Sequence, residues 1–198
     1  MLSPIMKNIV NDLDVDALEA FVADVAANPE HGKMRFGVTT RWTGQMRSES
    51  RAEPIELGGE TIARDFTIAA DEPEQIFGSN EAPNPQELLL AALNACMTVG
   101  YVEGAAMRGI RLDKLEIETR GELDLRGMLQ LSETVPPGYP AIDYIVRISG
   151  DGTPEQFAEI HAEVQKVSPN FDNLARAIRM NATIQVEAVG ENEPADAE

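Results

Sequence analysis

NPQELLLAALNACMTVGYVEGAAMR, residues Asn84 to Arg108, is the longest nearly uncharged stretch of the sequence. Asn84 can cap a helix, Pro85 suits the first helical turn, and Glu87 would lie near the positive end of the helix dipole. Apolar or small residues follow on almost every face, and Glu103 is the only charge before Arg108. The pattern predicts a helix of about 35 Å that is buried on most sides, as the central element of a globular core.

The same stretch has the length of a membrane span. No basic cluster flanks it. Four polar, charged or flexible residues interrupt it: Asn94, Thr98, Gly100 and Glu103. Since the rest of the chain has the composition of a soluble protein, we interpret the stretch as the core helix of a globular domain.

Composition narrows the classes of function. With 198 residues, 43% of them hydrophobic, the chain can bury one sizeable core, as one domain with extensions. Its net charge of -18 repels phosphate backbones and anionic lipid, so we expect neither nucleic acid nor a membrane as partner. A single cysteine excludes a disulfide framework, and MLSPIMKNIVND lacks the apolar segment of a signal peptide. We expect a cytoplasmic protein.

Hydrophobic periodicity predicts a helix and three strands before the central stretch. Asp14 to Ala27 repeats apolar residues at helical spacing and stops at Asn28-Pro29, which predicts an amphipathic helix. The apolar face of that helix could pack on the core or on a second subunit. The period then changes to two, and turn residues separate three expected antiparallel strands: residues 34–41, 46–57 and 61–69.

Further elements follow the central stretch. The pattern predicts strands at residues 112–125 and 143–149, a helix capped by Thr153-Pro154-Glu155-Gln156, a short helix at 170–178 and a last strand at 181–188. Blocks of strands separated by helices, with hairpins among the strands, indicate an α+β fold. We divide the chain into an amphipathic helical extension, a domain and an acidic disordered tail: residues 1–30, 31–189 and 190–198.

Few residues of the sequence suggest a catalytic, phosphate-binding or metal site. The sequence contains no glycine-rich phosphate loop, HExxH or Gly-x-Ser-x-Gly motif. His31 and His161 are the only histidines and are far apart in the chain without other soft ligands, so we expect no metal and no other cofactor. We interpret His161 as a helix-surface residue.

Two interpretations of Cys96 are open, a buried core residue and a reactive thiol. A lone cysteine in an apolar helix is by default a small buried hydrophobe. A reactive cysteine must form a thiolate, which desolvation disfavours, so it needs a nearby cation and some exposure. Three arginines of the expected hairpin are candidate cations, and each is equally well read as an ordinary sheet-surface charge: Arg41, Arg47 and Arg51. Spacing alone leaves both readings open.

The block PNPQELLLAALNACMTVGYVEGAAMRG, residues 83–109, is followed by an expected strand and then by KVSPNFD at residues 166–172. Together these motifs resemble the OsmC/Ohr superfamily over roughly Met34 to Glu187. The resemblance is greatest to the branch whose second motif reads Ser-Pro-x-Phe-Asp in place of Cys-Pro. It implies an OsmC-like fold, with antiparallel sheets around a long buried cysteine-bearing helix, in an intertwined homodimer that has two equivalent sites at the subunit interface.

The resemblance also implies a chemistry. In the hydroperoxide-reducing members, a first cysteine, matched by Cys96, attacks the peroxide O–O bond and becomes a sulfenic acid. A second cysteine, at the position of Ser168, resolves it as a disulfide, which dithiols reduce. An arginine matched by Arg47 stabilises the thiolate, and a glutamate matched by Gln86 holds that arginine.

This sequence departs from the pattern at two of these positions. Ser168 cannot form a disulfide, so a Cys96 sulfenate would need an external thiol. Gln86 keeps a hydrogen-bond acceptor but lacks the charge that orients a guanidinium. At about 100° per residue, Glu87 would lie roughly opposite the thiol, so we interpret it as a helix N-terminal charge and not as the substitute.

Two functional hypotheses follow. In the first, a homodimer uses Cys96 to reduce a small organic hydroperoxide with an external thiol. In the second, the protein is a non-catalytic binding module, Cys96 is a core residue, and a cavity at the subunit interface holds a small lipophilic ligand; the expected lining residues are Leu89, Leu93, Met97 and Phe171. A structural role in stress without a ligand is a weaker third. Tyr139 is read as a turn-anchoring aromatic in preference to a residue of the cavity mouth.

Overall fold

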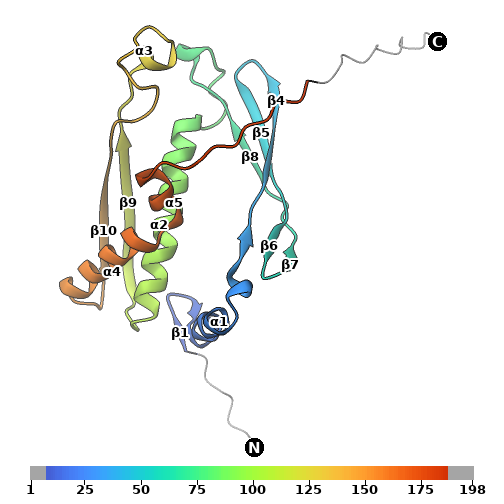
Figure 1. Ribbon diagram of the computed structural model, residues 1–198. Helices are drawn as coiled ribbons and strands as arrows, with labels where there is room; N and C mark the ends of the chain where they lie inside the picture. Colours follow the sequence, from blue (N-terminus) through green and yellow to red (C-terminus); the bar gives the residue numbers. More distant parts are fainter. Residues whose placement is uncertain (1–7, 187–198) are drawn as a thin grey trace, which may run out of the picture.

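The computed structural model describes residues 8–186, which form helices and short antiparallel sheets (Figure 1). The elements are β1 (Ile9–Val10), β2 (Leu13–Asp14), α1 (Val15–Ala27), η1 (Pro29–Gly32), β3 (Met34–Arg35), β4 (Val38–Gly44), β5 (Arg47–Ala52), β6 (Ile55–Leu57), β7 (Glu60–Ile62), β8 (Thr67–Ala70), η2 (Glu74–Ile76), α2 (Pro85–Ala106), β9 (Leu112–Gly121), α3 (Leu125–Met128), β10 (Ile142–Gly150), α4 (Pro154–Val167) and α5 (Pro169–Ala175). The sheets are β1–β2, β3–β6–β7, β4–β5–β8 and β9–β10. The expected α+β class with antiparallel sheets is confirmed.

The central helix, α2, begins where its sequence predicts. The Asn84 side chain accepts hydrogen bonds from the backbone N–H groups of Gln86 and Glu87, and the Glu87 carboxylate accepts one from the Asn84 N–H at 2.8 Å. This reciprocal capping box, with Pro85 in the first turn, satisfies donors that the helix itself leaves unpaired. Glu87 therefore serves as a helix N-terminal charge, as expected.

The core lies between α2, α4 and the β9–β10 sheet. The fully buried members of this cluster come from α2, its C-terminal turn and α4: Leu93, Met97, Tyr101, Ala105, Ile110, Ile160 and Val164. Two glycines of α2 let the helices approach closely. A Cβ atom on Gly100 would lie 3.1 Å from Val164 Cγ2, and one on Gly104 would lie 3.2 Å from Ile160 Cγ2.

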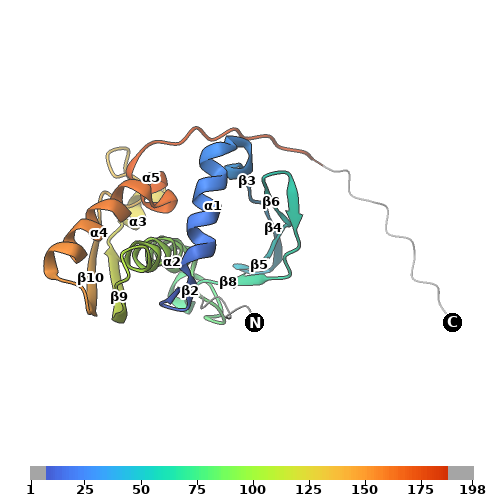
Figure 2. The ribbon, with the colours of Figure 1, turned by 90° about the horizontal axis from the view of Figure 1, so that it is seen from below.

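The expectation that α2 is buried on most sides is wrong for the single chain. Only one stripe of the helix is buried, where it packs against β9, α4 and α5. Other faces are open: Val99 is 56% exposed, and Ala91 and Ala95 are exposed as well. The reason lies in the architecture, since the β4–β5–β8 sheet stands apart from the β9–β10 layer on which α2 packs (Figures 1 and 2). Among the described residues, α2 is the one helix long and apolar enough to span a membrane, and the structure uses it as a core helix.

The N-terminal helix is confirmed as α1, with Asp14 as its N-cap. The side chain of Asn11 fixes the preceding β1–β2 hairpin to the start of β9, because its Nδ2 donates to Ile110 O and its Oδ1 accepts from Leu112 N, both at 2.9 Å. From there α1 runs between the α2 layer and the β3–β6 strands (Figure 2). Its apolar face is only partly covered, with Phe21 47% exposed.

The strands before α2 differ from the prediction of three long strands. Six shorter strands form instead. The expected hairpin of the first two strands is divided into two pairs, β4 with β5 and β3 with β6. One break falls at Glu53-Pro54, where proline has no N–H for the ladder. Similarly, the expected strand at 112–125 ends at Gly121, and Leu125 begins the short helix α3.

The last expected strand is also wrong within the described chain. Residues 177–186 run as an extended segment that joins no sheet, and the rest of that prediction and the acidic tail at 190–198 lie outside the described residues. The alternation that suggested a strand is present, since the even-numbered side chains are apolar: Ile178, Met180, Ala182, Ile184 and Val186. A strand pattern requires a partner to become a strand, and the described part of the chain supplies none.

The contact between α2 and α4 yields the first prediction. Gly100→Val should place two methyl groups against Val164 and lower the free energy of unfolding by about 1–3 kcal/mol, the usual cost of overpacking. Urea denaturation measures this change. Gly138→Val is the matched control, because a Cβ atom there meets nothing within 4 Å. Equal urea midpoints for the two variants would show that the close helix contact does not limit stability.

Candidate functional site

Cys96 faces the start of α5 and is half-buried. Its sulfur accepts two hydrogen bonds, one from the Ser168 hydroxyl at 3.4 Å and one from the backbone N–H of Asn170 at 3.5 Å. Hydrogen bonds that point at a sulfur favour its negatively charged forms. The thiol is thus placed in a polar niche and is not simply one more apolar contact of the core.

Ser168 occupies the joint between α4 and α5. Its backbone N–H donates to Val164 O at 2.9 Å and closes α4, while its hydroxyl accepts from Phe171 N at 3.4 Å and caps α5. Because a hydroxyl can accept and donate at once, the same oxygen still donates its proton to Cys96. The residue at the position matched to a resolving cysteine therefore touches Cys96, and it is 3% exposed.

An apolar cavity of about 520 Å³ lies beside this niche, between α2, α5 and the start of β10. Its walls are Gln86, Leu89, Leu93, Gly138, Tyr139, Pro140, Ala141, Ile142, Tyr144, Phe171, Leu174 and Ala175. Cys96 follows Leu93 by three residues on α2, so the two lie next to each other on the helix surface. The volume falls in the range that binds small molecules.

The structure distributes the expected cavity residues unequally. Leu89, Leu93 and Phe171 line the cavity. Met97 does not line it, because its side chain has no exposed area and packs in the core of the single chain. Tyr139 lines the cavity and also packs its ring against Gly121, which combines both readings considered for it.

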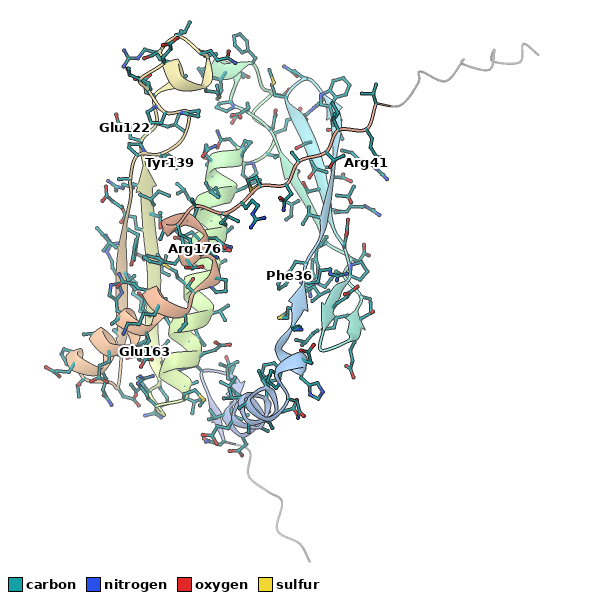
Figure 3. All side chains as sticks on the ribbon, viewed as in Figure 1. Phe36, Arg41, Glu122, Tyr139, Glu163 and Arg176 are labelled. Carbon is teal, nitrogen blue, oxygen red and sulfur yellow. The ribbon has the colours of Figure 1, made fainter. Side chains whose placement is uncertain are left out.

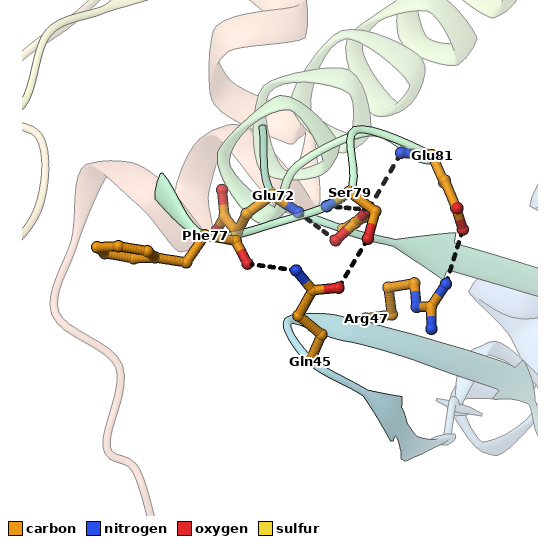
Figure 4. Close-up of polar contacts among 7 residues, drawn as sticks. Gln45, Arg47, Glu72, Phe77, Ser79 and Glu81 are labelled. Carbon is orange, nitrogen blue, oxygen red and sulfur yellow. Dashed lines mark hydrogen bonds and ion pairs between the residues drawn. The ribbon is translucent and has the colours of Figure 1, made fainter. Parts of the chain in front are cut away.

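Arg47 lies in a polar clamp at the turn of the β4–β5 hairpin (Figure 4). Its Nη1 pairs with Glu81 Oε2 at 2.9 Å, while Gln45 binds Phe77 O and Ser79 Oγ of the same loop. The hairpin is thereby tied to residues 71–81, just before α2. Arg47 has no contact with Cys96 within residues 8–186, and its Nε is buried without a hydrogen-bond partner there. Gln86, the expected partner of this arginine, lies instead in the cavity wall.

Asp71 organises the loop of this clamp. The carboxylate is 1% exposed and accepts the N–H groups of Glu72, Ser79 and Glu81 at 2.8, 3.0 and 3.1 Å. Burial on its own raises the pKa of Asp71, but the three donors and the charge of Arg47 outweigh it, so that the pKa lies below its ordinary value. Asp71 is therefore a buried, ionised anchor.

Figure 3 shows another hairpin arginine, Arg41, on the β4–β5–β8 sheet, across the molecule from Tyr139 of the cavity. Arg51 lies on β5 opposite Thr39 and Thr67. No contact of Arg41 or Arg51 with Cys96 occurs in the described chain. Of the three candidate cations, none reaches the thiol from its own chain.

His161 is not the surface residue that its sequence position suggested. The ring is half-buried, and its Nδ1 bonds the hydroxyl of the buried Tyr101 at 2.5 Å. Gln165, one turn further along α4, contacts His161 Nε2 and donates to the Tyr144 hydroxyl at 2.7 Å. Burial, followed by the nearby Tyr144, raises the pKa of Tyr101, so this phenol stays neutral. The chain of contacts ends at a wall residue of the cavity.

The possible ligands for metals are dispersed. His31 pairs with Asp24 at 2.8 Å on the outside of α1. Among residues 8–186, no three side chains of the His, Cys, Asp and Glu types gather as a possible metal site.

Sequence reasoning missed Asp71, Glu81 and Asn170. The loop DEPEQIFGSNEAP at residues 71–83 showed acidic side chains, but its sequence did not show which of them turns inward. Asn170 stands within the second motif of the resemblance, and only the packing of α5 on α2 gives it a role. The pair of Arg47 with Glu81 and the contact of Asn170 with Cys96 join residues that are 34 and 74 positions apart, beyond any local pattern.

The fold and the site define an α+β protein with a thiol site, in which the cysteine of a long helix accepts hydrogen bonds at the joint of two shorter helices. A family model described as OsmC-like protein matches residues 78–183, which is more than half of the chain and includes Cys96 and Ser168. The chain belongs to the OsmC-like family, as its motifs indicated.

Solved structures share the fold. An OsmC-like protein from Mycoplasma pneumoniae is 18% identical, with a TM-score of 0.57 over 71% of this chain and 87% of that one. A putative osmotic stress induced and detoxification response protein from Psychrobacter arcticus is 13% identical, with a TM-score of 0.52 over 68% and 85%. An OsmC-like protein of unknown function from Vibrio cholerae is 13% identical, with a TM-score of 0.51 over 70% and 92%. Among curated proteins, none matches the sequence.

The buried carboxylate of Asp71 gives the second prediction. Because its pKa is lowered by folding, it stabilises the protein above its ordinary value of 3.8, and this contribution disappears as the pH falls through the lower folded value. Asp71→Asn should therefore reduce the urea midpoint at pH 6, and its difference from the wild type should shrink at pH 3. Asp65→Asn, at an exposed position, serves as the control. A difference that stays constant from pH 6 to pH 3 would contradict an ionised anchor.

Proposed function

We propose that this protein reduces small organic hydroperoxides through Cys96, with an external thiol as reductant. The observation that carries the proposal is the placement of the Cys96 sulfur, which receives hydrogen bonds from Ser168 and Asn170 beside an apolar cavity. Polar donors at the sulfur support a thiolate, and an apolar wall suits the organic part of an alkyl or aryl hydroperoxide. Membership of the OsmC-like family agrees with both features.

The proposed reaction has two stages. The Cys96 thiolate attacks one peroxide oxygen, an S–O bond forms and the O–O bond breaks, and the departing alkoxide takes a proton and leaves as an alcohol. Cys96 is then a sulfenic acid. An external thiol attacks its sulfur and releases water, which leaves a mixed disulfide, and a second thiol restores Cys96 with release of the reductant's disulfide. Ser168 supplies a hydrogen bond to the sulfur but no resolving sulfur.

The role proposed for Arg47 depends on assembly. Within one chain this guanidinium pairs with Glu81, so an arginine contact to Cys96 has to come from a second subunit of the proposed homodimer. The resemblance implies that a glutamate at the position of Gln86 holds this arginine, but in this chain Glu81 pairs with it. Gln86 itself lies in the cavity wall, where its amide offers the ligand a hydrogen-bonding group.

Two exposed apolar surfaces support the homodimer. One is the open face of α2 around Val99, and the other is the alternating segment 178–186, in which Met180 and Ile184 are each 84% exposed. Covering such surfaces lowers the free energy of a soluble chain, and an extended alternating segment gains hydrogen bonds when it joins a sheet edge. A second copy of the chain offers both a matching helix face and free sheet edges.

The third prediction tests this assembly. Native mass spectrometry of the purified protein should give twice the 21.6 kDa of one chain. Val99→Lys should shift the population to monomer, because the lysine would be buried between the two subunits. Ile145→Lys is the matched control, since Ile145 is similarly exposed, at 55%, but lies on β10. A wild-type monomer at micromolar concentration would rule out the homodimer.

A second function has one observation in its favour. Arg47 is already engaged by Glu81, and none of the three hairpin arginines contacts the thiol in the described chain. The apolar cavity could therefore serve a non-catalytic module that binds a small lipophilic ligand. Native mass spectra of freshly purified protein would show such a ligand as an added mass. For either function, membership of the OsmC-like family favours a soluble protein, and a cytoplasmic location stays a prediction.

The fourth prediction concerns turnover. With dithiothreitol or dihydrolipoamide as reductant, the wild-type protein should consume cumene hydroperoxide, and should do so faster than hydrogen peroxide, because only the organic substrate fills the apolar cavity. Colorimetric assay of the remaining peroxide measures both rates. Cys96→Ser should abolish the protein-dependent rate. If the wild type and Cys96→Ser give the same rate with both reductants, the peroxidase function is excluded.

A further inference from the structure

Asn170 contacts α2 twice, once through its backbone and once through its side chain. Its backbone N–H donates to the Cys96 sulfur at 3.5 Å, and its side-chain Nδ2 donates to the carbonyl oxygen of Ala92 at 2.8 Å. The second contact is the shorter and better defined of the two, because it joins a strong donor to a strong acceptor. It joins residues that are 78 positions apart.

The acceptor of the side-chain bond is significant. In an α-helix, the carbonyl of residue 92 is the one that accepts the backbone N–H of residue 96. The Asn170 amide therefore binds the same peptide oxygen that fixes the backbone of Cys96. One side chain thus joins the start of α5 to the turn of α2 that ends at the thiol.

We propose that Asn170 is a positioning residue for Cys96: the bond from the Asn170 side chain to Ala92 O holds the backbone N–H of Asn170 against the Cys96 sulfur. This inference deepens the proposed function and concerns the same site. Without the side chain, the start of α5 keeps its N–H group but loses the bond that fixes its distance from α2. The Asn170 N–H would then be poorly placed as a donor to the sulfur.

Removal of the Asn170 side chain takes away no charged group from the neighbouring elements. On α5, Asp172 pairs with Arg176 at 2.6 Å. Arg108, just after α2, pairs with Glu163 of α4 at 2.6 Å, and Lys166 lies two residues before Ser168. A change in the pH dependence of Cys96 chemistry on loss of the Asn170 side chain would therefore report the lost contact.

The experiment uses iodoacetamide, which alkylates thiolates and needs neither a peroxide nor a reductant. Because Cys96 is the only cysteine, intact mass follows its alkylation directly. Rates are measured from pH 5 to pH 11 for the wild type, Asn170→Ala and Asn170→Leu, the second of which keeps the side-chain size without the donor. Asn173→Ala, also on α5, is the control. Thermal melting of each variant verifies that it is folded.

We expect both Asn170 variants to react about fivefold more slowly than the wild type at pH 7, the factor for one lost hydrogen bond. Their pH profiles should move to higher pH and reach the wild-type rate at pH 11, where every thiol is ionised. A wild-type profile in both variants, or a rate increased at every pH by loosened structure, would overturn the proposal. A shifted profile in a protein without peroxidase activity would retain the role of Asn170 and exclude only the function.

Discussion

The close contact between α2 and α4 is the constraint on which the site depends. Gly100 and Gly104 leave room for Val164 and Ile160, so the two helices pack at a fixed register. Gly100 lies one turn beyond Cys96, and Val164 lies one turn before Ser168, whose N–H it accepts. The register that buries the core therefore also sets the Ser168 hydroxyl against the thiol. Packing and chemistry share one interface.

The two halves of the chain contribute different parts of the proposed chemistry. The α2, α4 and α5 side carries the thiol, its donors and the apolar cavity, whereas the hairpin side carries Arg47 in its clamp with Glu81 (Figures 1 and 4). The loop that leads into α2 joins the sides, because its Glu81 pairs with Arg47 of the hairpin and its Phe77 and Ser79 bind Gln45. Under the proposed function, an arginine of one subunit would contact the thiol of the other subunit of the proposed homodimer.

Local signals were enough for much of the fold. The start of α2, its capping box and the helices α1 and α4 depend on residues a few positions apart, and Cys96 stood out as the only cysteine. The division between core and cavity was less accessible: Met97 and Leu93 are both apolar residues of α2, and only the packing of α4 and α5 determines that Met97 is in the core. The ion pair of Arg47 with Glu81 and the contacts of Asn170 depend on distant segments, so no periodicity could have indicated them.

Intact mass of the reduced protein, recorded after brief exposure to hydrogen peroxide or cumene hydroperoxide with a dimedone-type trap, tests the reactivity of Cys96 most directly. We expect rapid formation of one trapped sulfenic acid per chain, faster with the organic peroxide and lost in Cys96→Ser. Trapping no faster than that of a small free thiol would contradict a peroxide-reducing site, and the apolar cavity would then have to be explained by a ligand that it binds.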